Sequence, residues 1–171
     1  DLIYLDPRPA MSELGRIYPD SYHAFGFDEQ TFGLVHKVRG QLEARRLLRA
    51  ARGLPDDARV LDVGCGDGFH LQLLRQYGPS GWTLMGVDND PRAVEAAQRR
   101  NLRVELATIE NSTIAPASID MVLCVQTVEH VADPVALLKA IRSVLRPGGR
   151  LYLVTDNTGS PDFAVAKGRH W

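Results

Sequence analysis

The sequence has only two cysteines, and this scarcity excludes a fold stapled by disulfides. Cys65 and Cys124 lie 59 residues apart, without the short spacings of a zinc site, and free thiols are typical of a reducing compartment. The net charge is only −1, so the chain also lacks the excess of one charge that would indicate a dedicated surface for nucleic acid. No apolar run is long enough to cross a membrane, and no secretion signal is visible. We therefore expect a cytoplasmic protein without a membrane or nucleic-acid partner, and its oligomeric state stays open.

An initiating methionine is missing as well, since the chain starts at Asp1 and stops at Trp171. We interpret it as a segment of a longer protein. Its 171 residues fit one domain, and 44% hydrophobic with 24% charged residues are enough for a packed core. Residues 1–32 are rich in Pro, Tyr and Phe without sustained periodicity, so we expect an N-terminal arm there, and residues 33–171 form the core.

One glycine-rich stretch organises the core. An apolar run from Val60 ends at Asp62 and Val63, and glycines then follow at every second position through Gly68. This pattern predicts a buried strand, a tight turn and a helix that begins at about Phe69. The spacing differs from the dinucleotide fingerprint G-x-G-x-x-G, and Asp62 would place a negative charge beside a pyrophosphate. An acid at this turn suits a ligand that carries a cation.

Strands and helices alternate along the rest of the core. The predicted elements are helix 33–52, strand 60–63, helix 69–77, strand 82–88, helix 91–100, strand 102–106, strand 119–125, a helix from 134 and strand 151–155. Asp90-Pro91 and Asp133-Pro134 each predict a capped helix start. The alternation predicts a doubly wound, mainly parallel α/β sheet with helices on both faces. Ligands then bind at the carboxyl ends of the strands.

Two further patterns lie on the predicted helices. Val135, Leu138, Ile141 and Leu145 form an amphipathic stripe, which Pro147-Gly148-Gly149 ends. The helix over residues 33–52 carries several arginines. They are expected mainly to cover apolar surface with their stems, and an anion-binding patch is the alternative.

Residues 60–68 resemble the first motif of the class I S-adenosylmethionine-dependent methyltransferases, and the likeness extends over residues 58–156. The resemblance implies a Rossmann-like fold, S-adenosylmethionine as cofactor and methyl transfer to an acceptor. Residues 4–9 and 17–22 resemble the lead-in of small-molecule methyltransferases, which implies a small acceptor and an arm that covers cofactor or substrate. An aromatic-rich arm that packs on the edge of the sheet is the alternative. The family's sheet normally closes with two more strands, and they are absent here, so the core is expected to be truncated at its C-terminus.

The same resemblance implies a set of cofactor-binding residues. In the glycine turn these are Asp62, Gly64, Cys65, Gly66 and Gly68. Asp88 ends the second strand, where a carboxylate accepts both ribose hydroxyls, and Asn89 borders the adenine. A polar turn without a ligand is the alternative for these two residues.

Two later loops complete the expected site. Ile109 would cover the adenine and Glu110 would reach its exocyclic amine, with a purely structural loop as the alternative. Gln126 would contact the methionine part of the cofactor. His130 would take a proton from an acceptor hydroxyl, or else only order its loop. The other histidines have no partners at metal-ligand spacing, so we expect no metal.

Two other functions stay open at this point. A nicotinamide-dependent oxidoreductase uses a similar sheet, and the glycine spacing argues against it. A non-catalytic ligand-binding module is the second alternative, because the missing strands leave the acceptor pocket incomplete.

Overall fold

The computed structural model describes residues 29–157 and Gly159. The expected arm over residues 1–32 therefore lies almost entirely outside the described residues. The elements are α2 (Glu29–Ala50), β1 (Arg59–Val63), α3 (Phe69–Tyr77), β2 (Thr83–Asp88), α4 (Pro91–Arg99), β3 (Val104–Leu106), η3 (Ile109–Asn111), β4 (Ile119–Val125), η4 (Val128–His130), α5 (Pro134–Val144) and β5 (Leu145–Val154).

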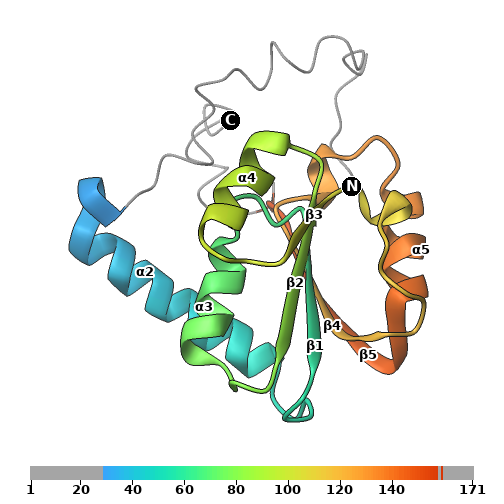
Figure 1. The fold of residues 1–171 in the computed structure, drawn as a ribbon, viewed down its shortest axis with the longest axis horizontal. Helices are drawn as coiled ribbons and strands as arrows, with labels where there is room; N and C mark the ends of the chain where they lie inside the picture. The colour runs from blue at the N-terminus through green and yellow to red at the C-terminus, as the bar shows by residue number, and fades with distance from the viewer. Residues whose placement is uncertain (1–28, 158, 160–171) are drawn as a thin grey trace.

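The five strands form one parallel sheet in the order β3-β2-β1-β4-β5. Helices α2, α3 and α4 lie on one side of this sheet and α5 on the other (Figure 1). The predicted doubly wound α/β fold is confirmed. The chain order reverses beside β1, which pairs with β2 on one side and β4 on the other. Sheets of this kind bind ligands at such a switch point, outside the carboxyl ends of the strands.

Alternating side chains of the central strands fill the two layers. Leu61 and Val63 of β1 pack with Leu137 and Ile141 of α5 on one face. Val60, one position over, packs with α2 and α3 on the opposite face. Because strand side chains alternate between faces, Asp62 shares the α2–α3 side with Val60.

The predicted helix starts are confirmed in detail. Asp90 accepts a hydrogen bond from the Arg92 N–H at 2.9 Å, and Pro91 is the first residue of α4. Asp133 accepts from the N–H groups of Val135 and Ala136 at the start of α5. Each carboxylate satisfies donors that the first helical turn leaves without a partner.

Two boundaries differ most from the predictions. Helix α2 begins at Glu29 rather than at residue 33, because two helical pieces run together across a kink at Gly33. Strand β5 begins at Leu145, so the predicted stop at Pro147-Gly148-Gly149 lies inside the strand. There the register slips: Ile119 pairs with Leu145 and Met121 with Arg150, so these residues loop out between two paired ends.

The predicted apolar stripe of α5 is partly wrong. The buried residues are Leu137, Ile141 and Val144, whereas Val135 and Leu138 are 57% and 39% exposed. The helix carries two overlapping apolar stripes, and only contact with the sheet decides which one faces inward. None of the described helices combines the length and the apolar character that crossing a membrane requires.

Candidate functional site

The glycine turn connects β1 to α3 at the switch point, and its glycines have left-handed backbone angles. The φ values are 70° at Gly64, 55° at Gly66 and 83° at Gly68, a region that other residues rarely adopt. A Cβ atom at Gly64 would collide with the Thr127 side chain, and one at Gly68 would collide with Leu102. At these two positions the missing side chain therefore makes room for the protein's own residues.

Four N–H groups of this turn donate to the protein's own acceptors. Those of Gly64 and Cys65 donate to the Val87 carbonyl at 2.9 and 3.2 Å, and that of Gly68 donates to the Cys65 carbonyl at 2.9 Å. The Gly66 N–H donates to Asp88 Oδ2 at 2.8 Å. A pyrophosphate needs such groups free, so this turn is not built as an anion cradle.

Asp88 presents a half-buried carboxylate at the end of β2. Its Oδ2 accepts from Gly66 and its Oδ1 accepts from the Asp90 N–H at 2.8 Å. A carboxylate offers about four lone-pair sites, so each oxygen still has one for a hydroxyl donor. The two backbone bonds fix the direction in which the remaining capacity points.

Asp62 is buried behind the turn, with only 1% of its surface exposed. Its Oδ2 has no hydrogen-bond partner among the described residues, and His70 Nδ1 of α3 lies 3.7 Å away. Burial lowers the pKa of His70, but the carboxylates of Asp62, Glu43 and Asp67 outweigh that effect and raise the pKa above its ordinary value. The acid expected to meet a ligand's cation thus faces a histidine in this structure.

The loop after β4 lies on the other side of the switch point. Gln126 has a left-handed φ of 52°, and its side-chain amide donates to Asp156 Oδ1 at 2.9 Å. Thr127 Oγ1 lies 3.2 Å from the carbonyl oxygens of Val63 and Val125. The threonine therefore joins the ends of β1 and β4, and the unusual φ of the exposed Gln126 is of the kind that concentrates at functional sites.

Other expected site residues are less clearly gathered. Asn89 and Glu110 are exposed, and so is His130 at the end of η4. Ile109 is only 5% exposed and packs in the core beneath α5. The structure gives Ile109 a packing role, and its contact with an adenine stays a prediction.

The two cysteines are free and buried. Burial, together with the charge of Asp62, raises the pKa of Cys124 to about 11 and raises that of Cys65 well above its ordinary value. Both side chains are therefore thiols at neutral pH and not nucleophiles. Within residues 29–157 no group of three or more His, Cys, Asp and Glu side chains is placed to hold a metal.

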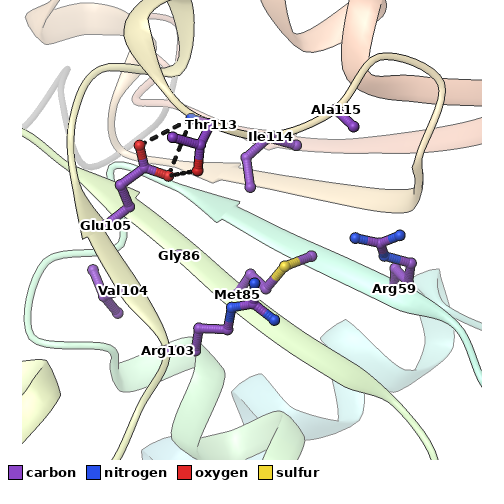
Figure 2. Close-up of a pocket in the computed structure, with 9 residues that line it drawn as sticks. All are labelled: Arg59, Met85, Gly86, Arg103, Val104, Glu105, Thr113, Ile114 and Ala115. Atoms are coloured by element: carbon purple, nitrogen blue, oxygen red, sulfur yellow. Dashed lines mark hydrogen bonds between the residues drawn. The ribbon is translucent and has the colours of Figure 1, made fainter.

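A cavity of about 470 Å³ lies elsewhere on the sheet, and Figure 2 shows its lining. Arg59, the first residue of β1, lines it, with Arg103 just before β3 and Met85 of β2. Residues 113–115 also line the cavity, and Glu105 holds them in place by accepting hydrogen bonds from the N–H and the hydroxyl of Thr113 (Figure 2). The cavity contains none of the expected cofactor-binding residues, so it is separate from the switch-point site.

Two residues of this site, His70 and Thr127, were not expected from the sequence. His70 is the second residue of α3, and its place in the helix that follows the turn was the available signal. Thr127 carried no signal, because only the pairing of β1 with β4 brings it to Gly64.

Comparison with known proteins identifies the family. Residues 61–153 match the model of a family described as "Methyltransferase domain". The chain is 36% identical over 124 residues to a ubiquinone biosynthesis O-methyltransferase of Xanthomonas campestris pv. campestris (strain B100), covering 68% of this chain and 51% of that protein. The chain thus spans about half the length of the curated relatives that it matches.

Solved structures share the fold. A possible histamine N-methyltransferase from Thermotoga maritima superimposes with a TM-score of 0.59 at 24% identity, over 78% of this chain and 64% of its own. Geranyl diphosphate methyltransferase in complex with SAM gives a TM-score of 0.64 at 19% identity, over 77% of this chain and 56% of its own. The matches confirm the resemblance noted from residues 60–68, including the Rossmann-like fold and S-adenosylmethionine as the family's methyl donor. The chain therefore belongs to the methyltransferase-domain family, the class I S-adenosylmethionine-dependent methyltransferases.

Proposed function

We propose that this chain holds S-adenosylmethionine at the switch point and directs its methyl group to a small-molecule acceptor. One observation carries the proposal: the N–H groups of Gly64, Cys65, Gly66 and Gly68 are used internally, while the Asp88 carboxylate stands half-buried at the carboxyl end of β2 and that of Asp62 is buried in β1. Such a site favours a ligand with hydroxyl donors and positive charge. It disfavours a dinucleotide, whose pyrophosphate would meet two acids and few free donors.

The roles of the remaining residues follow from their positions. We assign Asp88 to the ribose hydroxyls, Asn89, Ile109 and Glu110 to the adenine side, and Gln126 to the methionine end. Cys65 and the turn glycines would contribute backbone only, because the Cys65 thiol is buried. When bound, the cofactor supplies an electrophilic methyl group on a positively charged sulfur. The chain orients that group and excludes water from it.

The acceptor is proposed from the relatives. Curated relatives are named O-methyltransferases, so we propose an acceptor hydroxyl, with His130 as the base that takes its proton. His130 is exposed at the carboxyl end of β4, on the edge where the cofactor is proposed to bind. A small acceptor in the cytoplasm, rather than a nucleic acid, is part of the same proposal.

Calorimetric titration with S-adenosylhomocysteine and with NAD tests the cofactor. We expect the first ligand alone to bind and Asp88→Ala to weaken it about 10- to 150-fold, since hydrogen bonds to a charged group are worth roughly 1.5–3 kcal/mol. Asp57→Ala is the matched control, because Asp57 is an exposed aspartate before the amino end of β1. Binding of NAD instead would overturn the proposal. Cofactor binding without methylation of any hydroxyl acceptor in a broad panel would identify a non-catalytic module.

A further inference from the structure

The Asp62 carboxylate is the most deeply buried acid of the site. It is 1% exposed, and its Oδ2 makes no hydrogen bond to the described residues. Burying an ionised carboxylate costs several kcal/mol unless a positive charge or hydrogen bonds compensate it. The structure therefore has to provide a partner for this charge when no ligand is present.

His70 is placed to be that partner. Its Nδ1 lies 3.7 Å from Asp62 Oδ2, and its side chain is only 18% exposed. That distance suits an ion pair and is too long for a hydrogen bond. Because Asp62 sits on the strand face that looks toward α3, the second residue of the helix covers it.

Other charges around His70 act in the same direction. Glu43 of α2 and Asp67 of the turn both favour its protonated form. Each of these acids also has an arginine partner, since Glu43 pairs with Arg46 at 3.3 Å and Asp67 pairs with Arg100. Asp62 has no such arginine among the described residues, so the charge of His70 matters most for it.

We propose that His70 is a positioning residue whose protonation state determines how strongly the Asp62 carboxylate attracts the positive charge of a bound cofactor. The inference rests on the proposed function, because it concerns S-adenosylmethionine at the same site. A protonated His70 neutralises the pair, and the site then attracts the cofactor's positive charge weakly. A neutral His70 leaves the pair with one negative charge, which attracts that positive charge across a poorly screened interior.

The sign of the pH dependence follows from reciprocity. A cationic ligand beside the pair favours the neutral form of His70 and lowers its pKa, so a proton on His70 weakens the ligand by the same factor. Affinity is then expected to rise with pH through the pKa of His70, about tenfold for each unit by which binding lowers that pKa. S-adenosylhomocysteine lacks the sulfonium charge, so its affinity should rise less than that of S-adenosylmethionine.

The same pairing predicts a stability effect in the ligand-free chain. Because the pKa of His70 is raised in the folded state, its proton stabilises the fold fully below about pH 6.5 and loses this contribution as the pH rises through the raised pKa. NMR titration of the His70 imidazole should therefore give a pKa above 6.5. Asp62→Asn should lower that pKa, and Glu43→Gln should lower it less.

The test is calorimetric titration of the full chain with both ligands between about pH 5.5 and 8.5, a range that brackets the ordinary pKa of histidine. His70→Gln keeps a side chain that can donate to Asp62 but does not titrate, so it should bind with little pH dependence. Asp57→Asn is the control and should keep the wild-type slope, because Asp57 is an exposed aspartate before the amino end of β1 and lies outside the proposed site. Thermal melting establishes that each variant is folded.

The outcomes separate the two proposals. A rise of affinity with pH that is steeper for S-adenosylmethionine and absent in His70→Gln supports the inference. Binding with equal pH profiles in wild type and His70→Gln overturns it and leaves the proposed function intact. Loss of the slope in Asp57→Asn would also overturn it. No binding of either ligand at any pH would overturn the proposed function, and the inference with it.

Discussion

Gly64 leaves space for the Thr127 side chain at the junction of β1 and β4. The glycine has a left-handed φ of 70°, and the threonine side chain occupies the position of its absent Cβ. Thr127 Oγ1 also reaches the last carbonyl of β1, that of Val63. The position of the Thr127 side chain therefore depends on the absence of a side chain at Gly64.

We expect Gly64→Ala to destabilise the ligand-free chain by about 2–5 kcal/mol. The left-handed backbone accounts for roughly 1–2 kcal/mol and the collision with Thr127 for roughly 1–3 kcal/mol. In the double variant with Thr127→Ala most of the collision is removed, because only the Cβ of residue 127 remains close, so urea denaturation should show favourable coupling of roughly 1–3 kcal/mol. Gly148→Ala is the control, since Gly148 has φ 81° and open space around it and should lose the backbone part alone. Strictly additive losses would contradict this account.

Residue chemistry was predictable where it depends on neighbours in the chain. The sequence indicated glycines with unusual backbone angles at 64, 66 and 68, and their positive φ values confirm it. It did not indicate that Thr127 fills the space at Gly64 or that His70 faces Asp62. Those contacts depend on the order of the strands in the sheet and on the angle between the turn and α3. The spacing of residues along the chain predicts neither of them.

Whole elements were predicted well where their ends carry a chemical signal. Asp90-Pro91 and Asp133-Pro134 marked the starts of α4 and α5 correctly, because a carboxylate and a proline have defined roles at a helix start. The start of β5 was not predicted, because Pro147-Gly148-Gly149 normally ends structure. Here the strand resumes its pairing with β4 beyond them.

The two aspartate caps give a matched pair at this scale. Asp133→Ala and Asp90→Ala should each cost about 1 kcal/mol of unfolding free energy, since each removes a side-chain acceptor at a helix start. Only Asp90→Ala should also weaken S-adenosylhomocysteine binding. The variant keeps the backbone N–H that donates to Asp88 Oδ1, but it loses the cap bond from Arg92 that holds this turn, and so the Asp88 carboxylate is oriented less firmly. Urea denaturation and calorimetric titration measure the two effects. Equal loss of affinity in both variants would show that helix stability in general, and not the link to Asp88, controls binding.

At the scale of the whole molecule, the order of the sheet explains what was predictable and what was not. Alternating strands and helices suffice to predict a parallel sheet with ligands at its carboxyl edge. The burial of residues at the edge of the sheet could not be predicted in this way, because it depends on what lies beyond β5. In the part of the chain that the structure describes, β5 has β4 on one side and no strand on the other.

That edge is apolar as well as unpaired. Leu151 and Leu153 are 38% and 42% exposed, and Val135 and Leu138 of α5 are also exposed. Leu151 and Leu153 pair with Val122 and Cys124 of β4, which belong to the core beneath α5, so they lie on the α5 face of the sheet. An unpaired strand with exposed leucines is a template for association with another chain.

We therefore expect the chain to self-associate as its concentration rises, and Leu151→Lys with Leu153→Lys to shift sedimentation velocity toward the monomer. Lysine on an edge strand opposes pairing by charge repulsion. Because both leucines are partly exposed, the double variant should keep its fold, which circular dichroism checks. Leu42→Lys is the matched control, since Leu42 is 51% exposed on α2, across the sheet from α5 (Figure 1). If Leu42→Lys disperses the chain equally, general surface charge and not the β5 edge controls association. A wild-type chain that is monomeric at every concentration would mean that this edge does not pair.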